Sequence, residues 1–272
     1  MISKMKREER KEHAQLMLSI MEDKKYTVNG ETIHIPPMSD AVYFRYSKLK
    51  DLCAIEKKAM PISKVNIEVI NMNTVDAVLK FGYGKSNVGV LNFASALHPG
   101  GGFITGAMAQ EEALCHASTL YNQLKNNKMY KDNKRECTDG LYNHSMCVCD
   151  SVFFKNGEGE LQNRQTIVTV VTSAAVNRNR VSDKNPELIG LVNKTMEERI
   201  EEIVKMFIRC GNRTIIVGAF GCGVFGNEPD FVAKAWKKVI EQYGGHFDTV
   251  IFAIMDKKGT GNYKVFKDIL CK

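Results

Sequence analysis

Two neighbouring carboxylates, Glu111 and Glu112, follow a glycine run at a short distance. The run occupies residues 100–102, and the spacer 103–109 separates it from the triplet 110–112. Like-charge proximity and partial burial raise the pKa of one carboxyl group toward neutrality, so such a pair can both supply and accept a proton. Each half alone is typical of a flexible loop whose acidic residues cap a helix. The two halves together are far less expected by chance, and they indicate acid–base chemistry.

A second glycine-rich segment follows the apolar residues 214–217. Four glycines lie within residues 218–226, and a predicted helix begins near Asp230. Such glycines free successive backbone amides to form an anion-binding nest, and the helix N-terminus adds partial positive charge. A tight strand-to-helix turn is the alternative, but it needs fewer glycines, so phosphate binding is favoured. Phe225 lies inside this polar loop, where a role in the apolar core is awkward.

Both loops need a scaffold, and the hydrophobic patterns predict strands that alternate with helices. Strands are expected at 66–71, 88–94, 146–154, 166–175, 214–220 and 248–256. Helices are expected at 4–22, 74–82, 110–124, 186–210, 230–244 and 261–270, and a hairpin over 26–35 turns at Asn29-Gly30. Several strands are apolar throughout, which favours a three-layer α/β sheet buried on both faces. In such sheets ligands bind beyond the carboxyl ends of strands, where both loops fall.

The combination of Gly-Gly-Gly, a short spacer and Gln-Glu-Glu resembles the signature of poly(ADP-ribose) glycohydrolases of the compact microbial type. Asn92 and Pro99-Gly100 resemble the asparagine-and-glycine loop of macrodomains, and residues 218–227 resemble the diphosphate loop of the family. The resemblance spans roughly residues 65–256. It implies a three-layer α/β/α macrodomain-like fold with a mixed sheet and an N-terminal helical extension. Residues 1–60 would be that extension, packed on one compact catalytic unit, 61–272.

The resemblance also implies roles for individual residues. Glu112 would be the catalytic acid that then deprotonates the attacking water, and Glu111 would hold ribose hydroxyls. Asn92 would bind the ribose hydroxyls of the released unit, and Phe225 would pack on the ribose that flanks the scissile bond. The remaining substrate-binding residues would be Gly100, Gly101, Gly102, Phe103, Gln110, Gly218, Phe220, Gly221, Cys222, Gly223, Val224, Gly226 and Asn227. An adenine pocket at Asn73 and Thr74 is the weakest of these assignments.

The implied reaction is hydrolysis of ribose–ribose bonds in poly(ADP-ribose) carried by modified proteins, mainly from the free chain end, with ADP-ribose as product. Backbone amides would hold the diphosphate, so neither a metal nor a cofactor is expected. Two alternatives remain open. One is an ADP-ribose-binding module without catalysis, for which the intact glutamate pair would have no use. The other is a hydrolase of mono-ADP-ribosyl conjugates, which the sequence discriminates poorly.

Charge and composition bear on the partners and the cellular location of the protein. The chain has 272 residues and a formal net charge of +7, which fits either a solubility charge or attraction to a polyanion. Direct nucleic-acid binding is not expected. No apolar run is long enough to cross a membrane, and the charged N-terminal residues do not form a secretory signal. The eight cysteines contain no C-x-x-C pair, so a reducing, intracellular location is expected and Cys147 and Cys149 are interpreted as core residues.

Overall fold

The computed structural model describes residues 2–47, 49, 55–137, 139–256 and 259–271, and Cys53 lies outside them. Its centre is a seven-stranded mixed sheet with the strand order β3-β6-β7-β5-β8-β9-β4. The strands are β3 (Val42–Phe44), β4 (Ile67–Ile70), β5 (Val88–Phe93), β6 (Met146–Lys155), β7 (Leu161–Ser173), β8 (Thr214–Val217) and β9 (Thr249–Ala253). β3, β6 and β7 pair antiparallel, whereas β7, β5, β8, β9 and β4 run parallel. The predicted mixed sheet is confirmed.

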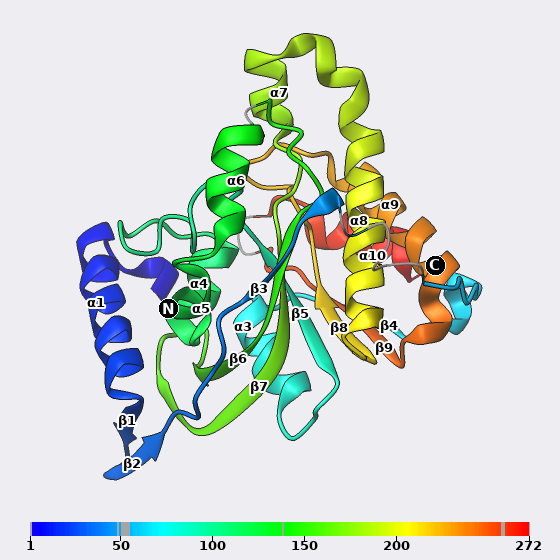
Figure 1. Cartoon of the computed structure of the whole chain (residues 1–272). Helices are drawn as coiled ribbons and strands as arrows, with labels where there is room; N and C mark the ends of the chain where they lie inside the picture. Colours follow the sequence, from blue (N-terminus) through cyan, green and yellow to red (C-terminus); the bar gives the residue numbers. More distant parts are fainter. Residues whose placement is uncertain (1, 48, 50–54, 138, 257–258, 272) are drawn as a thin grey trace.

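Helices cover both faces of this sheet, which confirms the three-layer expectation (Figure 1). One face carries α8 (Val192–Arg209), α9 (Pro229–Tyr243) and α10 (Asn262–Leu270). The other carries α1 (Arg7–Asp23), α3 (Thr74–Gly82), α4 (Gln110–Ala117), α5 (Leu120–Leu124) and α6 (Lys128–Glu136). The structure also contains helix α7 (Arg178–Lys184) and the 3-10 helices η1 (Ile2–Lys4), η2 (Ile62–Lys64), η3 (Pro186–Leu191) and η4 (Gly244–His246).

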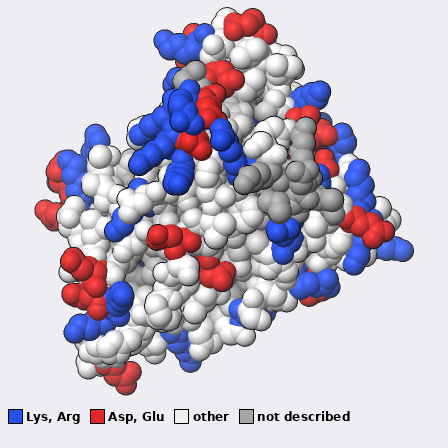
Figure 2. Space-filling model, viewed as in Figure 1, with Lys and Arg blue, Asp and Glu red and all other residues white. Residues whose placement is uncertain are grey.

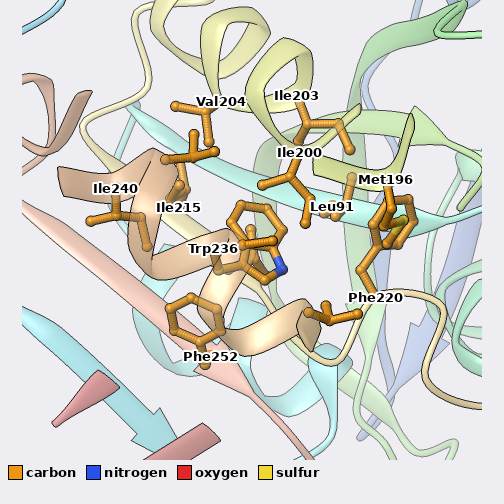
Figure 3. Close-up of a cluster of buried hydrophobic side chains, with 14 of the residues drawn as sticks. Leu91, Met196, Ile200, Ile203, Val204, Ile215, Phe220, Trp236, Ile240 and Phe252 are labelled. Atoms are coloured by element: carbon orange, nitrogen blue, oxygen red, sulfur yellow. The ribbon is translucent and has the colours of Figure 1, made fainter. Parts of the chain in front are cut away.

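Strand side chains alternate between two apolar cores, as the two-residue period of a strand requires. Leu91, Ile215 and Phe252 face the core under α8 and α9, where they surround the fully buried Trp236 (Figure 3). Their neighbours along the chain, Val90, Ile216 and Ile251, face the opposite core. Helices α1 and α3 to α6 cover that core. Both faces of the parallel strands are therefore buried, and their carboxyl ends are left as the open edge. Cys147 and Cys149 are buried in the second core, as interpreted from the sequence.

The N-terminal region contributes a helix and a hairpin. Helix α1 buries Ala14, Met17 and Ile20 in the second core. Strands β1 (Lys25–Val28) and β2 (Glu31–His34) pair antiparallel around Asn29 and Gly30, both of which have positive φ, as a two-residue hairpin turn requires. No helix of the described residues is long and apolar enough to span a bilayer.

Several predicted boundaries were wrong for tertiary reasons. The helix expected over 110–124 is two helices, because Ser118 is extended and forms a bridge with Phe153 of β6. The helix expected over 186–210 begins as the 3-10 helix η3, and α8 starts only at Val192. Strand β7 begins at Leu161, five residues before the predicted start, because Leu161 pairs with Lys155 of β6 across an irregularity in the register. Helices α6 and α7 were not predicted.

Charge is unevenly distributed over the face in Figure 2. Lys and Arg side chains gather over α6, where Lys128, Lys131 and Lys134 are exposed, whereas both signs mix over the rest of this face. Several lysines of other helices pair with carboxylates, such as Lys234 with Asp230. A local excess of positive charge of this kind attracts polyanions.

Candidate active site

A cavity of about 420 Å³ lies at the carboxyl ends of the parallel strands. The residues that follow β5, β8 and β9 line it, together with the first residues of α3 and α4. This is the edge at which open α/β sheets bind ligands, because strand ends and helix N-termini converge there. Both loops singled out in the sequence contribute to this edge.

The first loop folds tightly around the carboxylate of Glu112. Gly102 N–H donates to Glu112 Oε1 at 2.8 Å, and Ala109 N–H donates to Oε2 at 2.8 Å. Glu112 is the third residue of α4, so the second bond is the glutamate half of a capping box. Gly101 has φ +58, and a Cβ there would collide with Glu112 Oε1 and lie 3.1 Å from Glu111 Oε2. The glycine run thus brings its backbone against both carboxylates.

Glu111 is buried, with 2% of its surface exposed. Its Oε2 accepts from Ser95 N–H at 2.7 Å, and its Oε1 accepts from Asn92 Nδ2 at 3.2 Å. Burial, with a smaller contribution from the charge of Glu112, raises the pKa of Glu111 to about 8. One carboxyl group of the pair was expected to have a raised pKa, and that group is Glu111, which the raised pKa keeps protonated at neutral pH.

Asn92 lies at the end of β5, directly beneath Glu111. Its amide donates to Glu111 and to Thr172 Oγ1 at 3.3 Å, whereas its Oδ1 is buried without a partner among the described residues. A buried acceptor that lacks a donor is costly, so this oxygen still needs a hydrogen-bond donor. Asn92 does not itself line the cavity.

Gln110 fixes the start of α4 to the sheet. Its Oε1 accepts from Phe93 N–H at 2.8 Å, and its Nε2 donates to Leu91 O at 2.8 Å, so its amide pairs with β5 as a neighbouring strand would. Gln110 also lines the cavity, beside Ala109 and Ala113. The glutamate pair therefore lies directly beside the cavity wall.

The second loop presents its middle residues to the cavity. Gly221, Gly223, Val224 and Phe225 line it, and Val224 is 83% exposed. A Cβ at Gly223 would meet no atom within 4 Å, so its backbone borders open space. Buried residues hold the loop from behind. Asn227 Nδ2 donates to Val176 O at 2.7 Å and to Gly221 O at 3.1 Å.

Some predicted ligand contacts occupy other positions. Phe103 is fully buried, with its ring 4.7 Å from that of His116 and 4.9 Å from that of Tyr121, so its side chain belongs to the core. Asn227 is buried and holds the loop closed. Phe225 was thought awkward as a core residue, yet it is half-buried, packs on the core and lies 6.4 Å from the ring of Tyr142. Six other residues expected to bind the substrate do not line the cavity: Gly100, Gly101, Gly102, Gly218, Cys222 and Gly226.

Several cavity residues had no signal in the sequence. Ile2 lies in the N-terminal segment, and Asn156 and Gly157 lie in the turn between β6 and β7. Residues 253–255 also line the cavity, and the rule that ligands bind beyond strand ends could have found them. Asn73 and Thr74, the weakest assignment from the sequence, both line the cavity.

The raised pKa of Glu111 predicts a pH-dependent cost to stability. The folded protein keeps a proton that the unfolded chain releases between pH 4.5 and about 8, so stability falls as pH rises through this window. Glu111→Gln removes this titration. The unfolding free energy of the variant relative to that of the wild type should therefore increase by on the order of 4 kcal/mol from pH 4.5 to 8. Urea unfolding of both proteins across this pH range measures the difference. The contributions of the other titrating groups cancel in this difference. A difference that stays constant with pH would contradict the raised pKa of Glu111.

Comparison with known proteins places these features in a family context. Residues 14–156 match the model of the catalytic domain of microbial-type PARG. Among solved structures, the poly(ADP-ribose) glycohydrolase from Thermomonospora curvata is 28% identical with a TM-score of 0.85, and the match covers 96% of this chain and 99% of that one. Its complex with the inhibitor ADP-HPD matches with a TM-score of 0.84, at the same identity and coverage. The Deinococcus radiodurans enzyme in complex with ADP-ribose is 29% identical, with a TM-score of 0.78 and coverage of 85% and 94%. No curated protein matches the chain.

Proposed function

The chain belongs to the microbial-type poly(ADP-ribose) glycohydrolase family, and we propose that it hydrolyses the ribose–ribose O-glycosidic bonds of poly(ADP-ribose) with Glu112 as its acid–base residue. The observation that carries this proposal is the convergence of two carboxyl groups on Gly101, beside a cavity at the strand ends. Most glycosidases place two carboxyl groups at the scissile bond, and one of them protonates the leaving oxygen.

The two glutamates have different surroundings, which suits different roles. Glu112 protonates the departing ribose oxygen and then takes a proton from the attacking water. Glu111, whose pKa burial raises to about 8, carries a proton at neutral pH and can donate a hydrogen bond to a ribose oxygen. Asn92 Oδ1, buried without a partner among the described residues, accepts from a ribose hydroxyl of the released unit.

The second loop holds the diphosphate. Gly221, Gly223 and Val224 expose their backbone to the cavity, and the N-terminus of α9 follows the loop, where its partial positive charge favours an anion. Backbone amides bind phosphate without a metal. The adenosine then lies toward the far end of the cavity, at Asn73 and Thr74.

We further propose that the enzyme cuts mainly from the free end of the chain. The connection from β8 to α9 is short, and Phe225 within it packs against Tyr142. An internal cut requires a second ADP-ribose unit to pass this segment. Because Asn227 ties the loop to Val176, the segment cannot open without breaking buried hydrogen bonds.

One experiment tests both the reaction and its direction. The protein is incubated with automodified polymer and, separately, with mono-ADP-ribosylated protein, and released ADP-ribose and remaining chain length are followed over time. We expect ADP-ribose from the polymer at once, with gradual shortening of the chains. Early oligomers of intermediate length would indicate internal cutting. Release from the mono-modified protein alone would favour a hydrolase of mono-ADP-ribosyl conjugates, and binding without release would favour a module without catalysis.

A further inference from the structure

Helix α1 contacts the spacer between the glycine run and the glutamates through two arginines. Arg7 Nε donates to Thr105 O at 2.9 Å, and Arg10 Nε donates to Gly106 O at 2.7 Å. The Arg10 guanidinium also donates to Met5 O, which fixes its direction. A charged guanidinium makes stronger hydrogen bonds to carbonyl oxygens than a neutral donor does. Two successive carbonyls of the spacer are therefore held by one helix.

The backbones themselves touch at Gly106. This residue has φ +75, and a Cβ there would collide with the carbonyl oxygen of Arg7. Both the conformation and the lack of room require glycine. The spacer thus packs on α1 by close backbone contact as well as by hydrogen bonds.

The same spacer ends in the two amides that bind Glu112. One amide belongs to Gly102, which directly precedes the spacer, and the other to Ala109, the last residue of the spacer. Between them, the N–H groups of Thr105 and Ala107 both donate to Gly102 O at 3.0 Å, so residues 102–107 form one hydrogen-bonded unit that leads into Ala109. A shift at the residues held by α1 therefore moves the donors of the Glu112 carboxylate.

Helix α1 also contacts α4, the helix that carries the glutamates. His13 Nδ1 lies 2.9 Å from His116 Nδ1, and Lys155 Nζ lies 2.9 Å from His13 Nε2. With the Lys155 ammonium as donor, His13 Nε2 accepts and its Nδ1–H donates to His116. One helix thus holds both the spacer and α4, and so sets their relative position.

We propose that Arg7 and Arg10 are positioning residues for Glu112, an inference that rests on the proposed acid–base role of Glu112. They hold the spacer so that the Gly102 and Ala109 amides orient its carboxylate toward the scissile bond. The diphosphate binds on the separate loop 218–227, so loss of the arginines affects turnover far more than substrate affinity.

The test replaces the arginines singly and together. Arg7→Ala/Arg10→Ala should lower kcat about 10- to 100-fold with KM and the Kd of ADP-ribose within about threefold, because a displacement of about 1 Å is enough for such a loss. Arg10→Lys, which restores a donor, should recover much of kcat relative to Arg10→Ala. Gly106→Ala keeps both arginines but displaces the spacer, and should also lower kcat. The matched control is Arg213→Ala, because Arg213 likewise donates to a backbone carbonyl, that of His246, and should leave kcat unchanged.

A second readout does not depend on hydrolysis. Amide hydrogen exchange in residues 102–109 should be faster in the arginine variants than in the wild type, with α4 unchanged. Unchanged kcat in the folded double variant, or unchanged exchange in the spacer, would overturn the proposal. If the double variant does not fold, the same two readouts on Arg10→Ala and Gly106→Ala decide it. A wild-type protein that fails to cut polymer would refute the proposed function, while the exchange experiment would still report on the spacer.

Discussion

Glu112→Gln is expected to lower the rate of poly(ADP-ribose) hydrolysis about 100-fold or more, the usual scale for loss of general acid–base catalysis. The variant keeps the shape of the side chain but cannot transfer a proton. Its amide oxygen can still accept one backbone N–H, as capping boxes with glutamine do. Its NH₂ group then faces the second N–H, so a stability cost of about 1 kcal/mol is expected as well.

Turnover on automodified polymer and ADP-ribose affinity by calorimetry separate the two effects. Affinity should stay near the wild-type value, since Glu112 does not line the cavity and the proposed diphosphate site is the separate loop 218–227. Glu197→Gln, which removes a surface carboxylate paired with Lys238, is the control for charge alone. Because Glu111 is the residue whose pKa is raised to about 8, Glu111→Gln belongs in the same series. Near-normal turnover by Glu112→Gln, with turnover lost in Glu111→Gln, would transfer the acid role to Glu111.

The sheet could be predicted from the sequence because its strands carry their own signal. β8 is buried at every position, and its apolar run has no other stable place than the centre of a covered sheet. Helix α3 was predicted with its observed bounds, since an asparagine cap and a clear apolar face mark it. Helices α6 and α7 also begin at asparagine caps, but their apolar faces are small, because α7 buries only Val181 and α6 buries Met129 and Tyr130 beside the polar Asn133. The break at Ser118 comes from pairing with Phe153, which no local pattern encodes.

The site was predictable where it depends on strand ends and glycines, and not where it depends on tertiary contact. The loops around Gly102 and Gly221 were singled out by the spacing of their glycines and by their place after predicted strands. Phe103 was expected to touch the ligand because the family resemblance implied it, whereas its ring is buried beside that of His116. Ile2 reaches the cavity because the helix that follows it, α1, packs on the spacer 103–109. Such contacts join residues about a hundred positions apart, so sequence spacing gives no indication of them.

Gly223→Val is expected to weaken ADP-ribose binding about 100-fold while leaving the fold intact. A Cβ at this position would meet no protein atom within 4 Å, and φ is not in the left-handed region, so the substitution fits the loop without strain. The added side chain occupies the space beside the exposed amides, where the diphosphate is proposed to bind. Hydrogen bonds to a charged group contribute about 1.5–3 kcal/mol each, so the loss of one or two corresponds to this fall in affinity.

Calorimetry with ADP-ribose measures the effect, and thermal unfolding checks the fold. Gly190→Val is the matched control, because Gly190 also has open space around its Cβ and lies in η3, outside the cavity lining. Gly221→Val is less informative, since Gly221 has φ +74 and its Cβ would meet Asn227 Nδ2 at 2.5 Å, so a loss of binding there could follow from a distorted loop. Normal affinity in a folded Gly223→Val protein would mean that the phosphates do not approach this loop. The distinction matters for the proposed reaction, because a diphosphate held at Gly223 would fix the position of the ribose relative to Glu112.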